Sequence, residues 1–434
     1  MTGLLIKDAL IIPMDGVKRA VPWINGDVFI ADGVIREIGA NLTVKDEGCE
    51  IIHGKDTVVL PGLVNCHTHA GMTLLRSYAD DLPLMKWLSE KIWPREAHLT
   101  AQDIYRGTML SILEMIKSGT TCFADMYFFM DEVARAVEET GIRAVLSRGM
   151  VGTGDKAQFA LDESREFVKK WHKQADGRIT CMLGPHASYT CPPEYLYKVM
   201  QLSDELGVGL HIHLAETAGE VEDMEKKYGK TPIKLMEAIG IFKNRQVLAA
   251  HCVHVSDEEI EILKKYNVGI AHNPQSNMKL ASGAAPVPKM LKAGALVGLG
   301  TDSAASNNNL DLLEEMRTCA LLHKLVSLDS TVLPAYQVLE MATRQGSKVL
   351  GLEKTGSIQP GYKADLIMMD LHKPHLIPLH DPVANVVYAA QSSDIKTVIV
   401  DGKIVMKDRK ILTFDEEKIL FEAQECARDL VGRE

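Results

Sequence analysis

Four side chains that can bind a metal ion follow apolar segments along the chain. They are His67, His69, His213 and Asp302. Imidazole nitrogens and carboxylate oxygens are the ligands of catalytic zinc sites, which take three or four side chains and leave a position for water. Side chains at positions i and i+2 of a strand point to one face, so His67 and His69 point the same way. The pattern predicts a divalent-metal site built from these four residues.

His211 competes with His213 for the third position, because the sequence His211-Ile212-His213 also places two histidines on one face. We favour His213 because it lies nearer the end of its apolar segment and because Glu216 follows three residues later. His211 is then a histidine of the second layer or the core. The fourth segment ends in Gly184-Pro185-His186 and offers no lysine that could bridge two metals. We therefore expect one zinc ion per subunit, with iron or another divalent metal as the alternative.

The elements that must position these side chains alternate between strand and helix. Eight short segments rich in Val, Ile and Ala are strand candidates: 57–69, 119–125, 142–149, 179–186, 208–216, 246–252, 268–274 and 296–302. Apolar residues at helical spacing predict helices between them, for example at 103–117, 131–140, 193–206 and 257–265. Eight such units predict an α/β fold, a (β/α)8 TIM barrel, whose active-site residues gather at the carboxyl ends of the strands.

The two ends of the chain have a different pattern. Short alternating strands with turns at Asp32-Gly33 and Asp401-Gly402 predict β-hairpins. Neither end has enough apolar surface for a core of its own, so we expect both ends to pair into one small β-sandwich domain. The predicted domains are 1–58 together with 361–434, including a C-terminal helix at about 415–431, and the catalytic barrel at 59–360.

Composition and charge narrow the class of function. The chain has 434 residues, of which 46% are hydrophobic, and its formal net charge is −10. Acidic and basic residues are interleaved, and no apolar run approaches the roughly 18 residues that span a bilayer. We expect no nucleic-acid partner and no membrane partner, but a small-molecule substrate. The eight cysteines form no C-x-x-C pair, which predicts free thiols and a cytoplasmic location. The outer helices of a barrel favour assembly into a homo-oligomer.

Five motifs together resemble the amidohydrolase superfamily. They are PGLVNCHTH at 61–69, HLAE at 213–216, AHC at 250–252, HNP at 272–274 and GTD at 300–302. The likeness covers essentially the whole chain, and within the superfamily it is strongest to the 5′-methylthioadenosine/S-adenosylhomocysteine deaminases. It implies hydrolytic deamination of 5′-methylthioadenosine, S-adenosylhomocysteine, 5′-deoxyadenosine or adenosine to the inosine analogue and ammonia.

The resemblance also implies catalytic roles. A metal held by the four predicted ligands activates a water molecule, and Asp302 accepts a proton from it. Glu216 protonates a ring nitrogen of the purine and then helps to pass that proton to the departing ammonia. His251 stabilises the tetrahedral intermediate. The alternative role for Glu216 is that of a carboxylate that meets the dipole at a helix N-terminus; spacing and resemblance together favour the catalytic role.

Substrate contacts are likewise implied by the resemblance. The residues expected to contact the substrate are Trp87, Glu96, Arg148, His186 and Glu216. Glu96 is expected to accept hydrogen bonds from the ribose hydroxyls, and Trp87 to pack against the 5′ substituent. Further contacts with the base or with the water are expected from Tyr189, Asn273, Ser303 and Ser306.

One position departs from part of this family. Some relatives have an arginine in the loop after the third strand, where it pairs with the homocysteine carboxylate. Here the loop at 150–159 offers only Lys156. Lysine supplies charge but no bidentate fork, so a preference for S-adenosylhomocysteine over nucleosides with smaller 5′ groups does not follow.

Two other classes of protein fit part of the pattern. One is a hydrolase of another amino- or chloro-substituted heterocycle, such as guanine, a pterin or a triazine, which would use the same metal chemistry. The other is a metal-free interaction protein that has kept only the fold. The complete ligand set and Glu216 argue against the interaction protein. Glu96, together with Trp87 and Arg148, favours a ribose-bearing substrate over a bare heterocycle.

Overall fold

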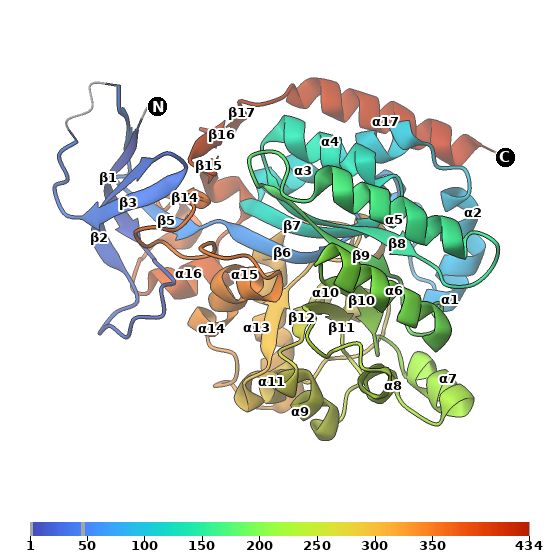
Figure 1. Cartoon of the computed structure of the whole chain (residues 1–434). Helices are drawn as coiled ribbons and strands as arrows, with labels where there is room; N and C mark the ends of the chain where they lie inside the picture. The colour runs from blue at the N-terminus through green and yellow to red at the C-terminus, as the bar shows by residue number, and fades with distance from the viewer. Residues whose placement is uncertain (1–2, 45–47, 434) are drawn as a thin grey trace.

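Eight parallel strands form the barrel, in the order of the sequence. The structure, a computed structural model, describes residues 3–44 and 48–433. Helices lie around the outside of the strands (Figure 1). The strands are β6 (Leu63–Thr68), β7 (Thr120–Tyr127), β8 (Arg143–Met150), β9 (Ile179–Pro185), β10 (Leu210–Leu214), β11 (Val247–His251), β12 (Gly269–His272) and β13 (Leu296–Leu299). The predicted (β/α)8 architecture is therefore confirmed.

The first and last barrel strands meet where the predicted metal ligands lie. The backbone N–H of Asp302, just after β13, donates to the carbonyl of His67 in β6 over 2.9 Å. A Cβ atom on Gly300 would lie 2.9 Å from the backbone nitrogen of His67, closer than such atoms approach. Glycine at position 300 thus allows the two strands to come together and sets Asp302 beside the histidines.

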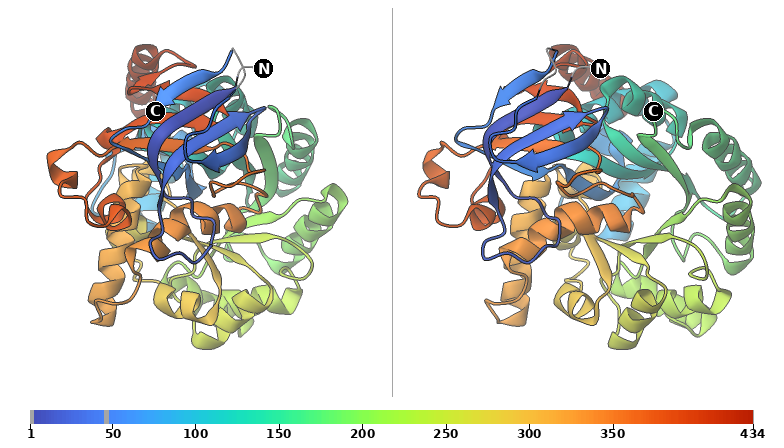
Figure 2. Two further views of the ribbon diagram at one scale, coloured as in Figure 1. Left: turned by 90° about the vertical axis from the view of Figure 1, so that its left-hand side faces the viewer. Right: turned by 60° about the vertical axis from the view of Figure 1, so that its left-hand side comes forward.

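The strands from the two ends of the chain form a second, nine-stranded sheet (Figure 2). They are β1 (Leu4–Ile11), β2 (Ile24–Ala31), β3 (Val34–Gly39), β4 (Glu50–His53), β5 (Thr57–Pro61), β14 (Leu366–Asp370), β15 (Ile395–Val400), β16 (Lys403–Lys407) and β17 (Lys410–Ile411). β5 pairs with β1 on one side and with β14 on the other, which joins the two ends. One apolar cluster holds Ile6, Val59, Leu366 and Ile399, so the two ends share a core.

Both Asp-Gly turns adopt the conformation that a tight hairpin needs. The φ angles are 54° and 73° at Asp32 and Gly33, and 49° and 76° at Asp401 and Gly402. Positive φ at both central residues is the requirement of a type I′ turn, which aspartate and glycine tolerate better than other residues. These turns connect β2 to β3 and β15 to β16, as predicted.

The predicted strand at 57–69 is two strands. β5 belongs to the terminal sheet and β6 to the barrel, and Gly62 alone separates them. A Cβ atom on Gly62 would lie 2.0 Å from the Thr121 hydroxyl oxygen, so the chain turns here against β7 without a side chain. An apolar run cannot reveal such a change of sheet, because both halves are buried. The domain boundaries at 58/59 and 360/361 stay a prediction.

The helices have the following bounds. Those that follow the barrel strands are α3 (Ala101–Lys117), α4 (Met130–Thr140), α5 (Ala157–Trp171), α6 (Pro193–Leu206), α7 (Ala218–Tyr228), α8 (Pro232–Ile239), α9 (Asp257–Lys265), α10 (Pro274–Lys279), α11 (Val287–Ala293), α12 (Ala304–Asn307), α13 (Leu312–Ser327), α14 (Ala335–Glu340) and α15 (Gly346–Val349). The C-terminal part adds α16 (Pro382–Tyr388) and α17 (Glu416–Gly432), and α17 packs on α3. No helix in the described ranges is long and apolar enough to cross a membrane.

A broken helical segment lies between β6 and α3. It consists of short 3₁₀, α and π turns, with α1 (Leu84–Trp87) and α2 (Trp93–Glu96) as its two α-helical pieces. These turns are too short to give a helical period in the sequence, and they were not predicted. The segment carries Trp87 and Glu96 and brings both to the barrel mouth.

Candidate metal centre and active site

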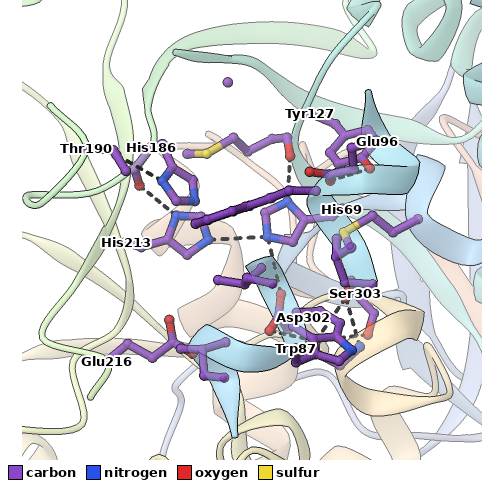
Figure 3. A pocket seen from close by; sticks show the side chains of 18 of the residues that line it. His69, Trp87, Glu96, Tyr127, His186, Thr190, His213, Glu216, Asp302 and Ser303 are labelled. Carbon is purple, nitrogen blue, oxygen red and sulfur yellow. Dashed lines mark hydrogen bonds and ion pairs between the residues drawn. The ribbon is translucent and has the colours of Figure 1, made fainter. Parts of the chain in front are cut away.

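The four predicted metal ligands converge at the carboxyl ends of β6, β10 and β13. Asp302 Oδ1 lies 3.5 Å from His67 Nε2 and 3.3 Å from His69 Nε2, and His213 Nε2 lies 3.3 Å from His69 Nε2. Figure 3 shows His69, His213 and Asp302 pointing toward one another. Two imidazole lone pairs that face each other at such a distance repel unless a cation lies between them. The donor set is therefore suited to a positive ion.

Hydrogen bonds on the outer nitrogens turn two of the rings toward the centre. His69 Nδ1 donates to the carbonyl of Met126 over 2.6 Å, and His213 Nδ1 donates to the carbonyl of His186 over 2.7 Å. In a neutral ring with the proton on Nδ1, the lone pair of Nε2 is free to bind a metal ion. Backbone carbonyls that fix the ring in this way are typical partners of metal-binding histidines.

His67 is oriented by a histidine rather than by a carbonyl. Its Nδ1 lies 2.8 Å from His211 Nε2, and His211 Nδ1 lies 3.4 Å from the Ser147 hydroxyl. His67 Nε2 is buried and has no hydrogen-bond partner among the described residues. Burial lowers the pKa of His67 to about 3, so its ring is neutral at pH 7. An unpaired, neutral nitrogen in the centre of the cluster is what a metal ligand requires.

Asp302 is the negative charge of the cluster. Its Oδ2 accepts hydrogen bonds from Ser276 Oγ over 2.6 Å and from Ser306 Oγ over 2.8 Å, which leaves Oδ1 to face the histidines. Burial opposes ionisation of Asp302, but the contacts with His67 and His69 hold its pKa well below the usual range. Burial also opposes charge on His69, yet Asp302 raises the pKa of that ring to about 9. The centre thus favours a positive charge, as a divalent-metal site must.

Two further groups face the same space. Glu216 Oε2 lies 3.8 Å from His251 Nε2, and both residues are buried. His251 Nδ1 donates to Asn277 Oδ1 over 2.9 Å, which directs Nε2 toward the centre. Burial raises the pKa of Glu216, which suits a carboxyl group that has to carry a proton. The glutamate is therefore placed for proton transfer beside the metal-binding residues.

A cavity of about 410 Å³ opens above the cluster. Its volume suits a ligand of nucleoside size. Glu96 lies in its wall and accepts a 2.7 Å hydrogen bond from the hydroxyl of Tyr127. Trp87 lines the cavity too, and its indole N–H donates to the carbonyl of Ala79 over 2.9 Å, which fixes the ring. Glu96 and Glu216 both line this cavity and lie in different parts of its wall (Figure 3).

Residues 58–405 match the amidohydrolase family, which is most of the chain. The chain belongs to the amidohydrolase family. A curated relative, named 5-methylthioadenosine/S-adenosylhomocysteine deaminase, from Syntrophomonas wolfei is 58% identical over 99% of this chain and 100% of its own length. A protein from Methanosarcina mazei named 5′-deoxyadenosine deaminase is 52% identical over 100% of this chain and 99% of its own length. The structure of an adenosine deaminase from Xanthomonas campestris with bound zinc matches with a TM-score of 0.93 at 33% sequence identity. The match covers 100% of this chain and 99% of that protein's chain.

The family and the donor set together support a divalent metal in this centre. One described group of possible ligands holds His67, His69 and His213, and a second holds His67, His251 and Asp302. The two groups share His67 and describe one site. His211, which the sequence offered as a rival ligand, lies behind His67 and contacts it through a ring nitrogen.

This amidohydrolase does not bring Arg148 to its cavity. The guanidinium Nε donates to Glu163 in α5 over 2.8 Å, and another nitrogen bonds the carbonyl of Gly149. Alternation along β8 explains the difference from the prediction: Ser147 points inward to His211, so the next residue points outward to the helices. Lys156 is exposed at the start of α5 and does not line the cavity either. Among the described residues that line the cavity, none is a lysine or an arginine.

The other expected contact residues lie in or beside the cavity. His186 lines it, and its Nδ1 lies 3.0 Å from the Thr190 hydroxyl. The lining also includes Tyr189, Ser303 and Ser306. Asn273 does not line the cavity; its amide lies 3.3 Å from His251 Nδ1.

Three residues that position the site were not predicted. Tyr127 bonds Glu96, Ser276 bonds Asp302 and Asn277 bonds His251. Tyr127 ends β7, so the rule that polar residues at strand ends form the site could have found it. Ser276 and Asn277 lie in α10, where the sequence shows only a short polar turn after His-Asn-Pro.

Proposed function

We propose that the protein is a metal-dependent hydrolytic deaminase of 5′-modified adenosines, which yields the inosine analogue and ammonia. The observation that carries this proposal is the shared cavity. A half-buried carboxylate, Glu96, lines the same cavity as Glu216 and three of the predicted metal ligands, His69, His213 and Asp302. A ribose requires an acceptor for its hydroxyls, and a purine requires a proton carrier beside an activated water. Relatives named for deamination of 5′-methylthioadenosine and 5′-deoxyadenosine support this reading.

The proposed resident ion is one zinc per subunit, held by His67, His69, His213 and Asp302. Zinc bound to a relative of the same fold supports this choice. An ion of this kind lowers the pKa of a water molecule toward about 7, which makes a nucleophile available at neutral pH. Iron or another divalent ion would supply the same chemistry.

The protein's own residues move the protons. Glu216, whose pKa is raised by burial, delivers a proton to a ring nitrogen of the purine. Asp302 receives a proton from the attacking water, and its two serine partners hold its other oxygen in place during that transfer. His251 Nε2, aimed by Asn277, stabilises the oxygen that adds to the ring carbon in the tetrahedral intermediate. Glu216, deprotonated by that first transfer, takes the proton of the new hydroxyl group as the carbonyl forms and passes it to the amino group, which leaves as ammonia. The proton on Asp302 is then released to solvent, and Glu216 takes up a new one.

The cavity wall favours a neutral 5′ substituent. Apolar residues of the broken helical segment, including Leu84, Trp87 and Leu88, line the cavity, whereas no described lysine or arginine does. The homocysteine tail of S-adenosylhomocysteine carries a carboxylate that would enter this wall without a partner. We propose that 5′-methylthioadenosine and 5′-deoxyadenosine are better substrates than S-adenosylhomocysteine.

Release of ammonia tests the proposed function. The purified protein, loaded with zinc, is assayed with 5′-methylthioadenosine, 5′-deoxyadenosine, S-adenosylhomocysteine, adenosine, guanine and a chlorotriazine. We expect the highest kcat/KM with the two nucleosides that have small neutral 5′ groups. Turnover of only guanine or the chlorotriazine would overturn the proposal and favour a hydrolase of bare heterocycles.

We also propose that the enzyme works in the cytoplasm as a homo-oligomer. The buried thiols, such as Cys122, Cys181 and Cys319, are free and suit a reducing compartment. The outer face of α13 exposes Leu321 and Leu325, which are 53% and 72% exposed. Light scattering after size-exclusion chromatography measures the subunit number, and a monomer would contradict the proposed assembly.

A further inference from the structure

A second group of metal-binding side chains lies outside the catalytic cluster. His272 ends β12, and Cys319 and His323 lie on α13, one turn apart. A nitrogen of each histidine and the Cys319 thiol lie within 4.8 Å of one another. The three residues are 0%, 0% and 1% exposed. This group, the β12–α13 cluster, takes no part in the proposed reaction, because none of its members lines the cavity.

The β12–α13 cluster is poorly satisfied by hydrogen bonds. His323 Nε2 lies 3.0 Å from His272 Nε2, so one proton at most is shared between them. His272 Nδ1 is buried and has no partner among the described residues. The Cys319 thiol has none there either, and burial raises its pKa. Buried polar groups without partners cost free energy, so a bound ion that accepts these three ligands would stabilise the cluster.

We propose that His272, Cys319 and His323 bind a second metal ion, a borderline-soft divalent cation such as zinc. Imidazole nitrogens and thiolates are both ligands that zinc takes in proteins. Two nitrogens on one tetrahedral zinc ion lie about 3.3 Å apart, close to the separation of the two Nε2 atoms. Binding replaces the thiol proton, which leaves to solvent as the sulfur–metal bond forms.

The ion would act as a structural clamp. It would tie β12 to α13, and β12 leads directly into Asn273 and α10. That segment supplies Ser276 to Asp302 and Asn277 to His251. The clamp would therefore hold in place the residues that orient the catalytic groups, without touching the substrate.

Cobalt spectroscopy tests this site separately from the catalytic centre. Metal is removed from the full-length protein with a chelator, and Co²⁺ is added back. A thiolate–cobalt bond gives an intense charge-transfer band in the near ultraviolet, and no ligand proposed for the catalytic centre is a thiol. We expect the band in the unmodified protein and in a Cys181→Ser control, and its loss in Cys319→Ser. Absence of the band in the unmodified protein, or its persistence in Cys319→Ser, would overturn the proposal.

Metal content and stability give a second readout. The zinc-loaded protein should contain two ions per chain by elemental mass spectrometry, and His323→Gln should contain one. His323→Gln should also unfold at a lower temperature. The cobalt band reports only on the β12–α13 cluster. If the proposed deaminase function were wrong but this second site bound metal, the band would still appear although the protein released no ammonia. One ion per chain in both proteins, with no thiolate band, would show that the two histidines share only a hydrogen bond.

Discussion

The Tyr127 hydroxyl donates a 2.7 Å hydrogen bond to Glu96 Oε1, and this contact fixes a half-buried carboxylate in the wall of the cavity. Burial raises the pKa of Glu96, whereas the bond from Tyr127 lowers it and so helps to keep the carboxylate charged. The tyrosine comes from a barrel strand and the glutamate from the broken helical segment. The contact therefore joins a rigid element to a less regular one at the place where a ribose would bind.

Glu96→Gln should weaken binding of nucleosides. Loss of hydrogen bonds to a charged acceptor costs about 1.5–3 kcal/mol, so KM for 5′-methylthioadenosine should rise by about ten- to a hundredfold while zinc content stays unchanged. Tyr127→Phe should raise KM by a smaller factor, because Glu96 remains. Steady-state kinetics measure both effects. An unchanged kcat/KM in Glu96→Gln would remove this residue from ribose recognition.

Glu216→Gln should slow the chemical step. The amide has the shape of the carboxyl group but cannot carry the proton, so kcat should fall by a factor of about 10²–10⁴. Metal content, measured by elemental mass spectrometry, should match the unmodified protein. Glu220→Gln is a matched control, since Glu220 bonds Ser188 and the backbone N–H of Glu216 rather than facing the metal cluster. Equal turnover in Glu216→Gln and the unmodified protein would contradict the assigned role.

The two serines on Asp302 should affect metal affinity. In a Ser276→Ala/Ser306→Ala double variant, Asp302 Oδ2 loses both hydrogen bonds, and affinity for zinc should fall by about 10–100-fold. Competition with a chromophoric chelator measures the dissociation constant. Ser164→Ala serves as the control, because Ser164 bonds only a carbonyl of its own helix. Retention of full affinity in the double variant would show that Asp302 needs no such support.

Arg148→Gln should leave substrate kinetics unchanged. Its guanidinium is bound to Glu163 and to the carbonyl of Gly149, away from the cavity. We expect kcat/KM for 5′-methylthioadenosine and S-adenosylhomocysteine within about twofold of the unmodified values, with a small loss of thermal stability from the broken ion pair. A rise of KM for S-adenosylhomocysteine alone would contradict this expectation and would show that Arg148 contacts the substrate, as the sequence analysis predicted.

The C-terminal helix should make a pH-dependent contribution to stability. Arg433 Nη2 donates to Asp103 Oδ1 over 2.9 Å and joins the end of α17 to the start of α3. Burial opposes ionisation of Asp103, but Arg433 and the other hydrogen bonds lower its pKa to about 2. The folded pKa lies below the unfolded value of about 3.9, so the stabilisation is present above pH 4 and is lost as the pH falls toward 2.

Arg433→Met measures that contribution. Its Tm should be lower than that of the unmodified protein by about 2 °C at pH 7, and the difference should narrow below pH 4. Differential scanning calorimetry at several pH values shows the trend. Lys418→Met, on the same helix, should show no such trend, because its partner Glu422 lies 4.0 Å away near the surface. A difference that grows on acidification would rule out the Asp103 contact as its source.

Sequence alone predicted the elements whose signals are local. Strand alternation placed His67 and His69 on one face, and the rule for barrel strand ends added His213 and Asp302. The resemblance implied a pocket role for Arg148, but alternation along β8 turns this residue outward, because its neighbour Ser147 points inward. The bond from Tyr127 to Glu96 could not be predicted, because it depends on the path of a segment too irregular to give a periodic pattern.

Because Gly62 joins a strand of the terminal sheet directly to a strand of the barrel, β5 is synthesised long before its partner strand β14. β5 and β6 leave the ribosome together, but β5 needs β14 as its outer neighbour, and β14 is made only after the whole barrel. The strand that carries His67 therefore emerges early and stays attached to an unfinished sheet edge until the last part of the chain appears. Unpaired edges of this kind invite wrong pairings, so a nascent chain halted before residue 366 should be prone to aggregate.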